Sequence, residues 1–536
     1  MKKLLLLGNE ALAQGAIDAG LSGAYAYPGT PSTEIMEYIQ NSEEAIRRNI
    51  HRHWSSNEKT AMETALGMSY MGKRAIVSMK HVGLNVAADA FVNSAMTGAN
   101  GGILVIVADD PGMHSSQNEQ DSRFYGKFAM LPILEPSNQQ EAYDMAEHGF
   151  KLSERFHIPV LLRIPTRLSH SRSTIVVHDP IAENKMHFPD NPDQWILLPA
   201  KSRKRYKVLI EDNKEFEKQS EVSPYNMYTA GRDLSMGIIA TGIAYNYLME
   251  NCPGGCKYPI LKIGQYPLPV NMIKRLKKEC ASILVIEEGQ PFVEEQIRGV
   301  LDDSYKVKGK LTGELPRTGE LTPEQIAVAL EVPIPAGFTR SNNIAPRPPA
   351  LCPGCGHRDM YNAINDVVRE KYPDARVYSD IGCYTLGYMP PIKAIHSCID
   401  MGASITVAKG AADAGQYPSL AVIGDSTFTH SGMTGLLDAV NEKSNIVVVI
   451  SDNETTAMTG GQDSQGTGKL ENICEGLGVD PAHIRVVVPL PKNMDEMKNI
   501  LIEEIEYNGV SVIIPRRACI QEAKRKRNKL KSLNIK

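Results

Sequence analysis

Short apolar runs alternate with amphipathic stretches along most of the chain. The apolar runs fall into two groups. The first group consists of Lys3–Leu7, Ala75–Met79, Ile103–Val107 and Val160–Ile164. The second group consists of Ser419–Ile423, Ile446–Ile450 and Val510–Pro515. Runs of this length predict strands buried on both faces, and the stretches between them, such as Met433–Val440, predict helices. The pattern therefore predicts an α/β protein with two doubly wound parallel sheets.

The chain is too long, at 536 residues, to form a single core. We expect a first domain over 1–180, a charged and irregular connecting segment over 181–234, a smaller α/β domain over 235–330, a linker over 331–350 and a last domain over 351–536. The linker prediction rests on its many prolines, which favour extended backbone over helix.

Composition excludes several classes of protein. With 42% hydrophobic and 22% charged residues and a net charge of −4, the chain has the composition of an ordinary soluble protein, and nothing indicates a nucleic-acid partner. The apolar start at Met1 ends at Gly8 without a cleavage site, so we interpret it as a first strand rather than a signal peptide. No stretch reaches the roughly 18 apolar residues of a membrane helix. Nine cysteines without a secretion signal predict the reducing environment of the cytoplasm.

Polar clusters follow two of the apolar runs in the last domain. Gly424-Asp425-Ser426 comes after the first run, and Asp452-Asn453-Glu454-Thr455 comes after the second. A lone Gly-Asp-Ser is more often a turn, but the carboxyl ends of parallel strands meet at one edge, where α/β sheets bind ligands. Gly424 would let the backbone approach a diphosphate, while Asp425, Asn453 and the Thr455 carbonyl offer the hard oxygen ligands of Mg²⁺. This is the layout of a thiamine diphosphate site.

Six further motifs support this interpretation. They are Tyr27-Pro-Gly-Thr-Pro-Ser-Thr-Glu34, Met79-Lys-His-Val-Gly-Leu-Asn85, Asp109-Asp-Pro-Gly-Met-His-Ser-Ser-Gln-Asn118, Cys352-Pro-Gly-Cys-Gly-His357, Ile381-Gly-Cys-Tyr-Thr385 and Met458-Thr-Gly-Gly-Gln462. With them the chain resembles the thiamine diphosphate-dependent 2-oxoacid:ferredoxin oxidoreductases, in particular the large subunits of indolepyruvate:ferredoxin oxidoreductase. The resemblance covers nearly the whole chain. It implies a pyrimidine-binding domain at 1–180, a transketolase C-terminal-like domain at 235–330 and a diphosphate-binding domain at 351–536.

The resemblance also implies roles for individual residues. Thiamine chemistry needs a carboxylate against the aminopyrimidine ring, and Glu58, followed three residues later by alanine, matches the family's glutamate. Glu63 is the competing candidate on another helical face, and without the resemblance both would be surface glutamates. Thr30 is expected to contact the substrate carboxylate or the thiazolium, although its loop alone would indicate helix capping. We also expect Gly402, His357 and Ser426 to bind the cofactor.

The cysteine pattern points to a redox centre. By itself, Cys352-x2-Cys355 fits half of a zinc site, a redox pair or half of an iron–sulfur site. The resemblance implies a proximal 4Fe-4S cluster, with Cys383 about thirty residues later and Cys519 far downstream as the remaining ligands. Four soft thiolates suit such a cluster. We expect structural roles for Cys252, Cys256, Cys280, Cys398 and Cys474.

The activity that the resemblance implies is oxidative decarboxylation of aryl 2-oxoacids such as indolepyruvate to acyl-CoA. We expect a smaller partner subunit in a dimer of heterodimers, and no membrane or nucleic-acid partner. The chain departs from the family because 17 residues follow Cys519 and contain no ferredoxin-like cysteine run. We therefore expect electrons to leave to a separate ferredoxin-like protein or to the partner subunit. The alternatives are a non-oxidative 2-oxoacid decarboxylase and a thiamine-binding subunit without turnover.

Overall fold

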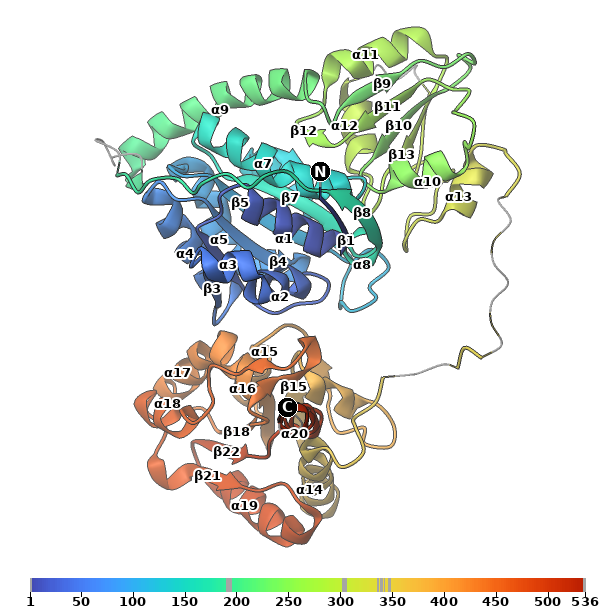
Figure 1. Ribbon diagram of the computed structural model, residues 1–536. Coiled ribbons are helices and arrows are strands. Elements are labelled where there is room, and N and C mark those ends of the chain that lie inside the picture. Colours follow the sequence, from blue (N-terminus) through green and yellow to red (C-terminus); the bar gives the residue numbers. More distant parts are fainter. Residues whose placement is uncertain are drawn as a thin grey trace. The chain divides into compact units, whose positions relative to one another are not determined.

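The chain forms two compact units in the computed structural model, residues 1–339 and 340–536 (Figure 1). The structure describes residues 2–188, 195–300, 306–334, 337, 341, 343–345 and 349–533. The boundary between the units lies within the predicted linker. Among these described residues, no helix has the length and apolar content needed to cross a membrane.

A seven-stranded sheet organises the first unit. Its strands, in spatial order, are β12 (Gln265–Tyr266), β6 (Ile133–Leu134), β7 (Val160–Pro165), β5 (Ile103–Asp109), β4 (Ala75–Lys80), β2 (Gly23–Ala26) and β3 (His51–Trp54). All neighbours are parallel except the edge pair of β12 and β6. The predicted strands that become β4, β5 and β7 are therefore confirmed as members of a parallel sheet.

Helices cover both faces of this sheet, which explains the continuous apolar runs. Ile76, Leu104 and Ile106 belong to one core together with α1 (Gly8–Asp18) and α7 (Gln139–Phe156). The alternating residues Val77, Val105 and Val107 belong to a second core with α4 (Glu58–Tyr70) and α5 (His81–Thr97). Because successive side chains of a strand point to opposite faces, every position of β5 and β7 is buried, and so is every position of β4 before Lys80.

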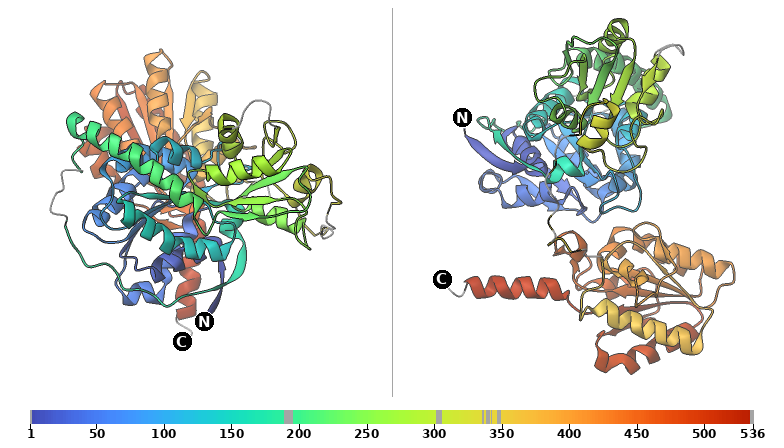
Figure 2. Two further views of the ribbon diagram at one scale, coloured as in Figure 1. Left: turned by 90° about the horizontal axis from the view of Figure 1, so that it is seen from above. Right: turned by 90° about the vertical axis from the view of Figure 1, so that its right-hand side faces the viewer.

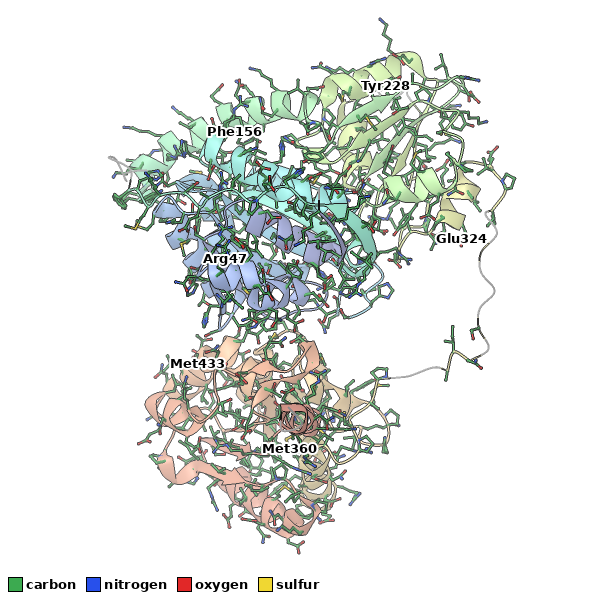
Figure 3. The ribbon with its side chains drawn as sticks, viewed as in Figure 1. Arg47, Phe156, Tyr228, Glu324, Met360 and Met433 are labelled. Atoms are coloured by element: carbon green, nitrogen blue, oxygen red, sulfur yellow. The ribbon has the colours of Figure 1, made fainter. Side chains whose placement is uncertain are left out.

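Two expectations for the first unit were wrong. Strand β1 (Lys3–Leu7) forms, but it pairs antiparallel with β8 (Arg172–Val176) in a separate two-stranded sheet. An apolar run predicts a strand but not its partner. The segment expected to be irregular contains the 23-residue helix α9 (Pro199–Glu221). Only a narrow stripe of α9 is buried, so charged residues hid its periodicity. Phe216 in that stripe meets the ring of Phe156 in α7 edge-on, with ring centroids 5.1 Å apart. Figure 3 labels Phe156.

A second, five-stranded sheet completes the first unit. Its order is β14 (Val307–Lys308), β13 (Ile283–Ile286), β10 (Gly237–Thr241), β11 (Ile260–Ile263) and β9 (Met227–Thr229), with β9 antiparallel to its neighbour. The chain leaves β11 and at once adds β12 to the edge of the seven-stranded sheet. The two sheets are therefore joined by a shared stretch of backbone.

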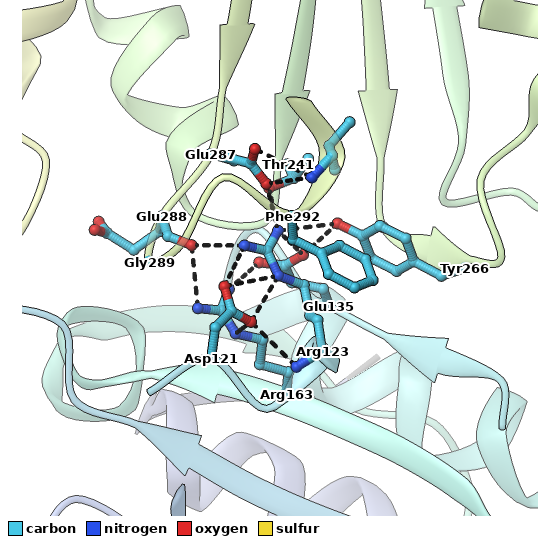
Figure 4. Close-up of polar contacts among 12 residues, drawn as sticks. Asp121, Arg123, Glu135, Arg163, Thr241, Tyr266, Glu287, Glu288, Gly289 and Phe292 are labelled. Atoms are coloured by element: carbon cyan, nitrogen blue, oxygen red, sulfur yellow. Dashed lines mark hydrogen bonds and ion pairs between the residues drawn. The ribbon is translucent and has the colours of Figure 1, made fainter. Parts of the chain in front are cut away.

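A buried ionic network also joins these two sheets (Figure 4). Arg163 of β7 contacts Asp109 at 2.6 Å and Glu135 at 2.5 Å. Arg123 contacts Asp121 at 2.5 Å and reaches Glu287, which follows β13, at 3.1 Å. Buried charges are costly unless they are paired, and each guanidinium here has carboxylate partners.

The second unit contains a six-stranded parallel sheet. Its order is β16 (Ser397–Cys398), β15 (Arg376–Ser379), β17 (Ser419–Gly424), β18 (Ile446–Ser451), β22 (Val510–Pro515) and β21 (Ile484–Val487). Helices α14 (Gly356–Lys371) and α19 (Met494–Glu506) cover one face, and α15 (Ala403–Asp413) and α17 (Met433–Asn441) cover the other. Helix α20 (Ile520–Leu533) extends away from this body (Figure 2). The predicted α/β class, with two mainly parallel sheets and a smaller third one, is confirmed.

Candidate active site

Asp425 is the most informative side chain of the second unit. Strand β17 ends at Gly424, and Asp425 opens the short helix α16 (Asp425–Thr427) at the carboxyl edge of the sheet. Its side chain is buried, with 2% exposed, and Oδ2 has no hydrogen-bond partner among the described residues. Burial, together with the nearby Asp452 and against a hydrogen bond with Ser464, raises the pKa of Asp425 to about 7. An unpaired buried carboxylate oxygen is unfavourable by itself, so this site fits a bound cation.

Two glycines near Asp425 sit where a side chain would not fit. A Cβ on Gly424 would lie 2.6 Å from Cε1 of Tyr384. Gly402, before α15, has a φ of +99°, and a Cβ there would lie 2.7 Å from the Cβ of Ser431. Ser426 shares a hydrogen bond with Thr456, with 3.0 Å between the two hydroxyl oxygens. The space that a side chain would take at these two glycines is therefore filled by Tyr384 and Ser431, and the predicted approach of the backbone to a diphosphate stays a prediction.

The loop after β18 is held by its own hydrogen bonds. Asn453 Oδ1 accepts the backbone N–H of Thr455 at 3.1 Å, and the Thr455 hydroxyl donates to the carbonyl of Gln462 at 2.9 Å. Asp452 pairs with Arg516 at 2.6 Å, so its charge is already compensated. Asn453 and Thr455 therefore remain, with Asp425, the candidate magnesium ligands.

The four cysteines of the predicted cluster lie in one region of the second unit. Burial is the largest cause that raises the pKa of Cys383 to about 12, and the thiols of Cys355, Cys519 and Cys352 and the carboxylate of Asp425 contribute to the same rise. The backbone N–H of Cys519 donates to the carbonyl of Asn453 at 3.1 Å, which places this cysteine beside the candidate magnesium loop. Within the part of the chain that the structure describes, however, no three His, Cys, Asp or Glu side chains are grouped as a ready metal site. The chemistry of the donors fits an iron–sulfur cluster, and the cluster stays a prediction.

His357 follows the Cys352–Cys355 pair on α14. It is buried, and within the described chain neither ring nitrogen has a hydrogen-bond partner. Burial lowers the pKa of His357 to about 4, so the imidazole is neutral at physiological pH. The ring lies edge-on to Tyr384, with centroids 6.2 Å apart. Two unpaired nitrogens in a buried position are consistent with its predicted contact to a polar cofactor.

Glu58 and Glu63 have different environments in the first unit. Glu58 is the first residue of α4, and 5% of it is exposed. A Cβ on Gly83 of α5 would lie 2.4 Å from Glu58 Oε1, so the carboxylate packs against the backbone of that helix. Glu63 forms a surface ion pair with Lys59, and 48% of its side chain is exposed. The geometry therefore favours Glu58 as the activating carboxylate.

Thr30 lies in the loop between β2 and α2 (Thr33–Asn41) and is partly buried. Its carbonyl accepts the hydroxyl of Ser115 at 3.2 Å, and the backbone N–H of Ser115 donates to Asp110 Oδ2 at 2.8 Å. Lys80, the last residue of β4, donates from Nζ to the Ser115 carbonyl at 2.9 Å. Burial lowers the pKa of Lys80 below its ordinary value, and the carboxylates of Asp110 and Glu58 only partly oppose this shift. Lys80 is therefore within electrostatic range of Glu58 and tied to the Thr30 loop through Ser115.

Comparison with known proteins assigns the chain to a family. Residues 14–226 match the family described as pyruvate flavodoxin/ferredoxin oxidoreductase, thiamine diphosphate-binding, and residues 380–514 match the C-terminal TPP-binding domain of thiamine pyrophosphate enzymes. The indolepyruvate oxidoreductase subunit IorA of Archaeoglobus fulgidus is 40% identical over 100% of this chain and 90% of the relative. The chain belongs to the IorA family. The IorA subunit of Pyrococcus abyssi is 38% identical over 97% of this chain and 86% of its own length.

A solved structure gives a weaker match to this IorA-family chain. The 2-oxoglutarate:ferredoxin oxidoreductase from Magnetococcus marinus is 18% identical and covers 61% of this chain and 65% of that chain, with a TM-score of 0.49. That overlap is too low to add to the assignment. The sequence relatives alone confirm the predicted family and identify the chain as a subunit of an oxidoreductase with thiamine diphosphate-binding domains.

Two residues of this IorA-family chain were not singled out from the sequence. Asp380 follows β15 as Asp425 follows β17; it is buried, and burial raises its pKa to about 6. It accepts the backbone N–H of Ser404 at 3.2 Å and the hydroxyl of Tyr384, so it holds the start of α15 and the ring beside Gly424. Lys80 is the second residue. Lys80 ends the buried apolar strand β4, and that position was an available signal, whereas Asp380 follows the half-buried strand β15 and only its place after a strand could have pointed to it.

Proposed function

We propose that this chain, with a smaller partner subunit, catalyses thiamine diphosphate-dependent oxidative decarboxylation of aryl 2-oxoacids such as indolepyruvate. The products are the acyl-CoA, CO₂ and electrons that pass through a 4Fe-4S cluster to a ferredoxin-like acceptor. Relatives named indolepyruvate oxidoreductase over nearly the whole chain support the substrate class. The observation that carries the proposal is the buried Asp425 with its unpaired oxygen at the end of β17, within the region that matches a TPP-binding domain.

We assign magnesium binding to Asp425, Asn453 and Thr455. Mg²⁺ prefers hard oxygen ligands and commonly bridges a carboxylate to phosphate groups. A divalent cation beside Asp425 would favour the ionised carboxylate and oppose the burial that raises its pKa to about 7. Gly424 and Gly402 offer backbone N–H groups without a side chain, although Tyr384 and Ser431 fill the space in which a Cβ would lie. Ser426 and the two unpaired nitrogens of His357 offer further polar contacts.

Thiamine diphosphate, when bound, supplies the carbon nucleophile for the ketone and the electron sink that lets CO₂ leave. Glu58 supplies a buried carboxyl group that can share a proton with the aminopyrimidine ring, and its contact with the backbone at Gly83 fixes where that group lies. We assign Thr30 to contact with the substrate carboxylate or the thiazolium. Both residues lie near the carboxyl edge of the seven-stranded sheet.

We assign the 4Fe-4S cluster, which supplies a one-electron acceptor, to Cys352, Cys355, Cys383 and Cys519. Burial and mutual repulsion disfavour the free thiolate of Cys383, and coordination to iron removes that penalty because a coordinating thiol is deprotonated. The same repulsion includes Asp425, so the proposed cluster ligands lie near the proposed magnesium ligand.

The experiment that tests this function is product analysis of the two-subunit complex under anaerobic conditions. We expect indolepyruvate, coenzyme A and a viologen or ferredoxin acceptor to give the acyl-CoA, with two electrons transferred for each CO₂ released. Asp425→Ala should lose this activity together with thiamine diphosphate binding. Aldehyde product without acceptor reduction would contradict the proposal and would favour a non-oxidative decarboxylase.

A further inference from the structure

We propose that Lys80 is a substrate-binding residue whose ammonium group holds the carboxylate of the 2-oxoacid. The inference rests on the proposed function, because it takes the substrate to be a 2-oxoacid. Lys80 was not singled out from the sequence, and the inference adds it to the site. Its ligand would be the substrate carboxylate, the group that leaves as CO₂.

The position of Lys80 in the sheet supports this role. Strand β4 lies between β5 and β2, and all three are parallel, so their carboxyl ends meet at one edge. Lys80 ends β4, the chain after β2 leads to Thr30, and the chain after β5 leads to Asp110 and Ser115. Ligands of α/β sheets bind at this edge. Lys80 is therefore at the centre of the candidate substrate end of the site.

The contacts of Lys80 leave it able to bind an anion. Its stem packs on Gly29, where a Cβ would lie 3.2 Å from Lys80 Cδ. Nζ donates to the Ser115 carbonyl, but among the described residues it forms no ion pair. An ammonium group has three donors, so capacity remains for a carboxylate. Lys80 is partly buried, and this burial lowers its pKa against the opposing effect of Asp110 and Glu58.

The neighbouring charged groups are already engaged. Asp110 accepts the Ser115 N–H at 2.8 Å and the hydroxyls of Ser116 and Thr166 at 2.7 and 2.8 Å. The other cations of this region have carboxylate partners: Arg163 contacts Asp109, and Arg167 pairs with Glu320. These arginines pair with carboxylates, whereas the ammonium group of Lys80 binds only the neutral carbonyl of Ser115 among the described residues. Asp110 and Glu58 act on Lys80 without forming an ion pair with it, so a ligand carboxylate beside Thr30 would be its first direct anionic partner among the described residues.

A structural role predicts a different outcome. If Lys80 serves only as the counter-charge of Glu58, its removal should disturb proton exchange at the cofactor rather than substrate affinity. If Lys80 binds the substrate, its removal should raise KM. The lost contact is made to the carboxylate of the bound substrate, before this group departs as CO₂.

The test uses Lys80→Met and Lys80→Gln in the complex with the partner subunit. We expect KM for the 2-oxoacid to rise about 10- to 100-fold, as for loss of one charge-assisted hydrogen bond. Thiamine diphosphate affinity and thiazolium hydrogen–deuterium exchange should stay at wild-type values. Lys80→Arg should recover part of the affinity. Lys73→Met is the matched control, because Lys73 lies before the amino end of the same strand, and it should leave KM unchanged.

Unchanged KM in a folded, thiamine-loaded Lys80→Met or Lys80→Gln complex would overturn the inference. Slowed thiazolium exchange with unchanged KM would overturn it as well, and would show that Lys80 acts as the counter-charge of Glu58. A wild-type complex that binds thiamine diphosphate but turns over no 2-oxoacid would refute the proposed function itself. The wild-type measurement comes first, so the two failures can be distinguished.

Discussion

Gly83 leaves the space that the carboxylate of Glu58 occupies: a Cβ on this glycine would lie 2.4 Å from Oε1 of Glu58. Because Gly83 is in α5 and Glu58 begins α4, this contact fixes the carboxylate relative to two helices. The position of the proposed activating group therefore depends on a residue in another element.

Gly83→Ala should displace Glu58 and slow turnover about 10- to 100-fold, since small displacements of a reacting group have effects of this size. Thiazolium hydrogen–deuterium exchange should slow in parallel. The matched control is Gly67→Ala in α4, where no atom lies within 4 Å of the added Cβ. Equal exchange in the two variants would show that the contact does not position Glu58.

Glu58→Gln should slow thiazolium hydrogen–deuterium exchange about 100-fold or more while thiamine diphosphate still binds, because the amide cannot share the proton. Glu63→Gln should leave exchange unchanged, since Glu63 is exposed and paired with Lys59. The reverse result, with slow exchange only in the Glu63 variant, would transfer the role to Glu63.

Asp425→Asn should have opposite effects on cofactor binding and on stability. The affinity for magnesium and thiamine diphosphate should fall about 100-fold or more in calorimetry, because a charged metal ligand is lost. Above pH 7, where Asp425 is ionised, the cofactor-free protein should gain about 1 kcal/mol of stability, because a buried carboxylate with an unpaired oxygen is removed. Near-normal affinity would remove Asp425 from the magnesium site.

Glu288 predicts a pH dependence of stability in the first unit. Burial raises the pKa of Glu288 from its ordinary value of 4.5 to about 7. The folded protein then binds more protons than the unfolded chain between these values, so this stabilising contribution is present at low pH. It should be lost as pH rises from about 5 to about 7, by at most about 1.4 kcal/mol per pH unit.

Thermal unfolding of the wild type and of Glu288→Gln across this pH range measures the effect. The variant should show a flatter dependence, because the titrating group is absent. Glu324→Gln is the control, since Glu324 lies at the exposed start of α13 (Pro323–Ala329). An equal slope in the wild type and Glu288→Gln would show that Glu288 does not titrate in this range.

The sequence predicted those parts of the fold that depend on local pattern. The strands β17 and β18 are buried on both faces, so their apolar runs were easily recognised. The polar residues after them predicted Asp425 and Asn453 as candidate ligands. The partner of β1 was not predictable, because pairing depends on distant residues. Helix α9 was missed, because its buried stripe is narrow.

The parts of the site that were missed depend on the order of strands in the sheet. Lys80 gains its significance because β4 lies between β2 and β5, which brings its ammonium to Ser115 and the Thr30 loop. Asp380 gains its significance because β15 is next to β17, which brings Tyr384 over Gly424. Strand order is a long-range property that no local motif encodes.

The most direct test of the central claim is the iron and acid-labile sulfide content of the anaerobically purified two-subunit complex, with its EPR spectrum after addition of indolepyruvate and coenzyme A. The proposed function predicts about four irons bound by this chain and a signal that appears on substrate reduction. Cys383→Ala in the same complex should lose both, which separates this cluster from centres in the partner subunit. Wild-type and Cys383→Ala complexes with the same iron content and the same spectrum, and with thiamine diphosphate bound, would contradict the claim.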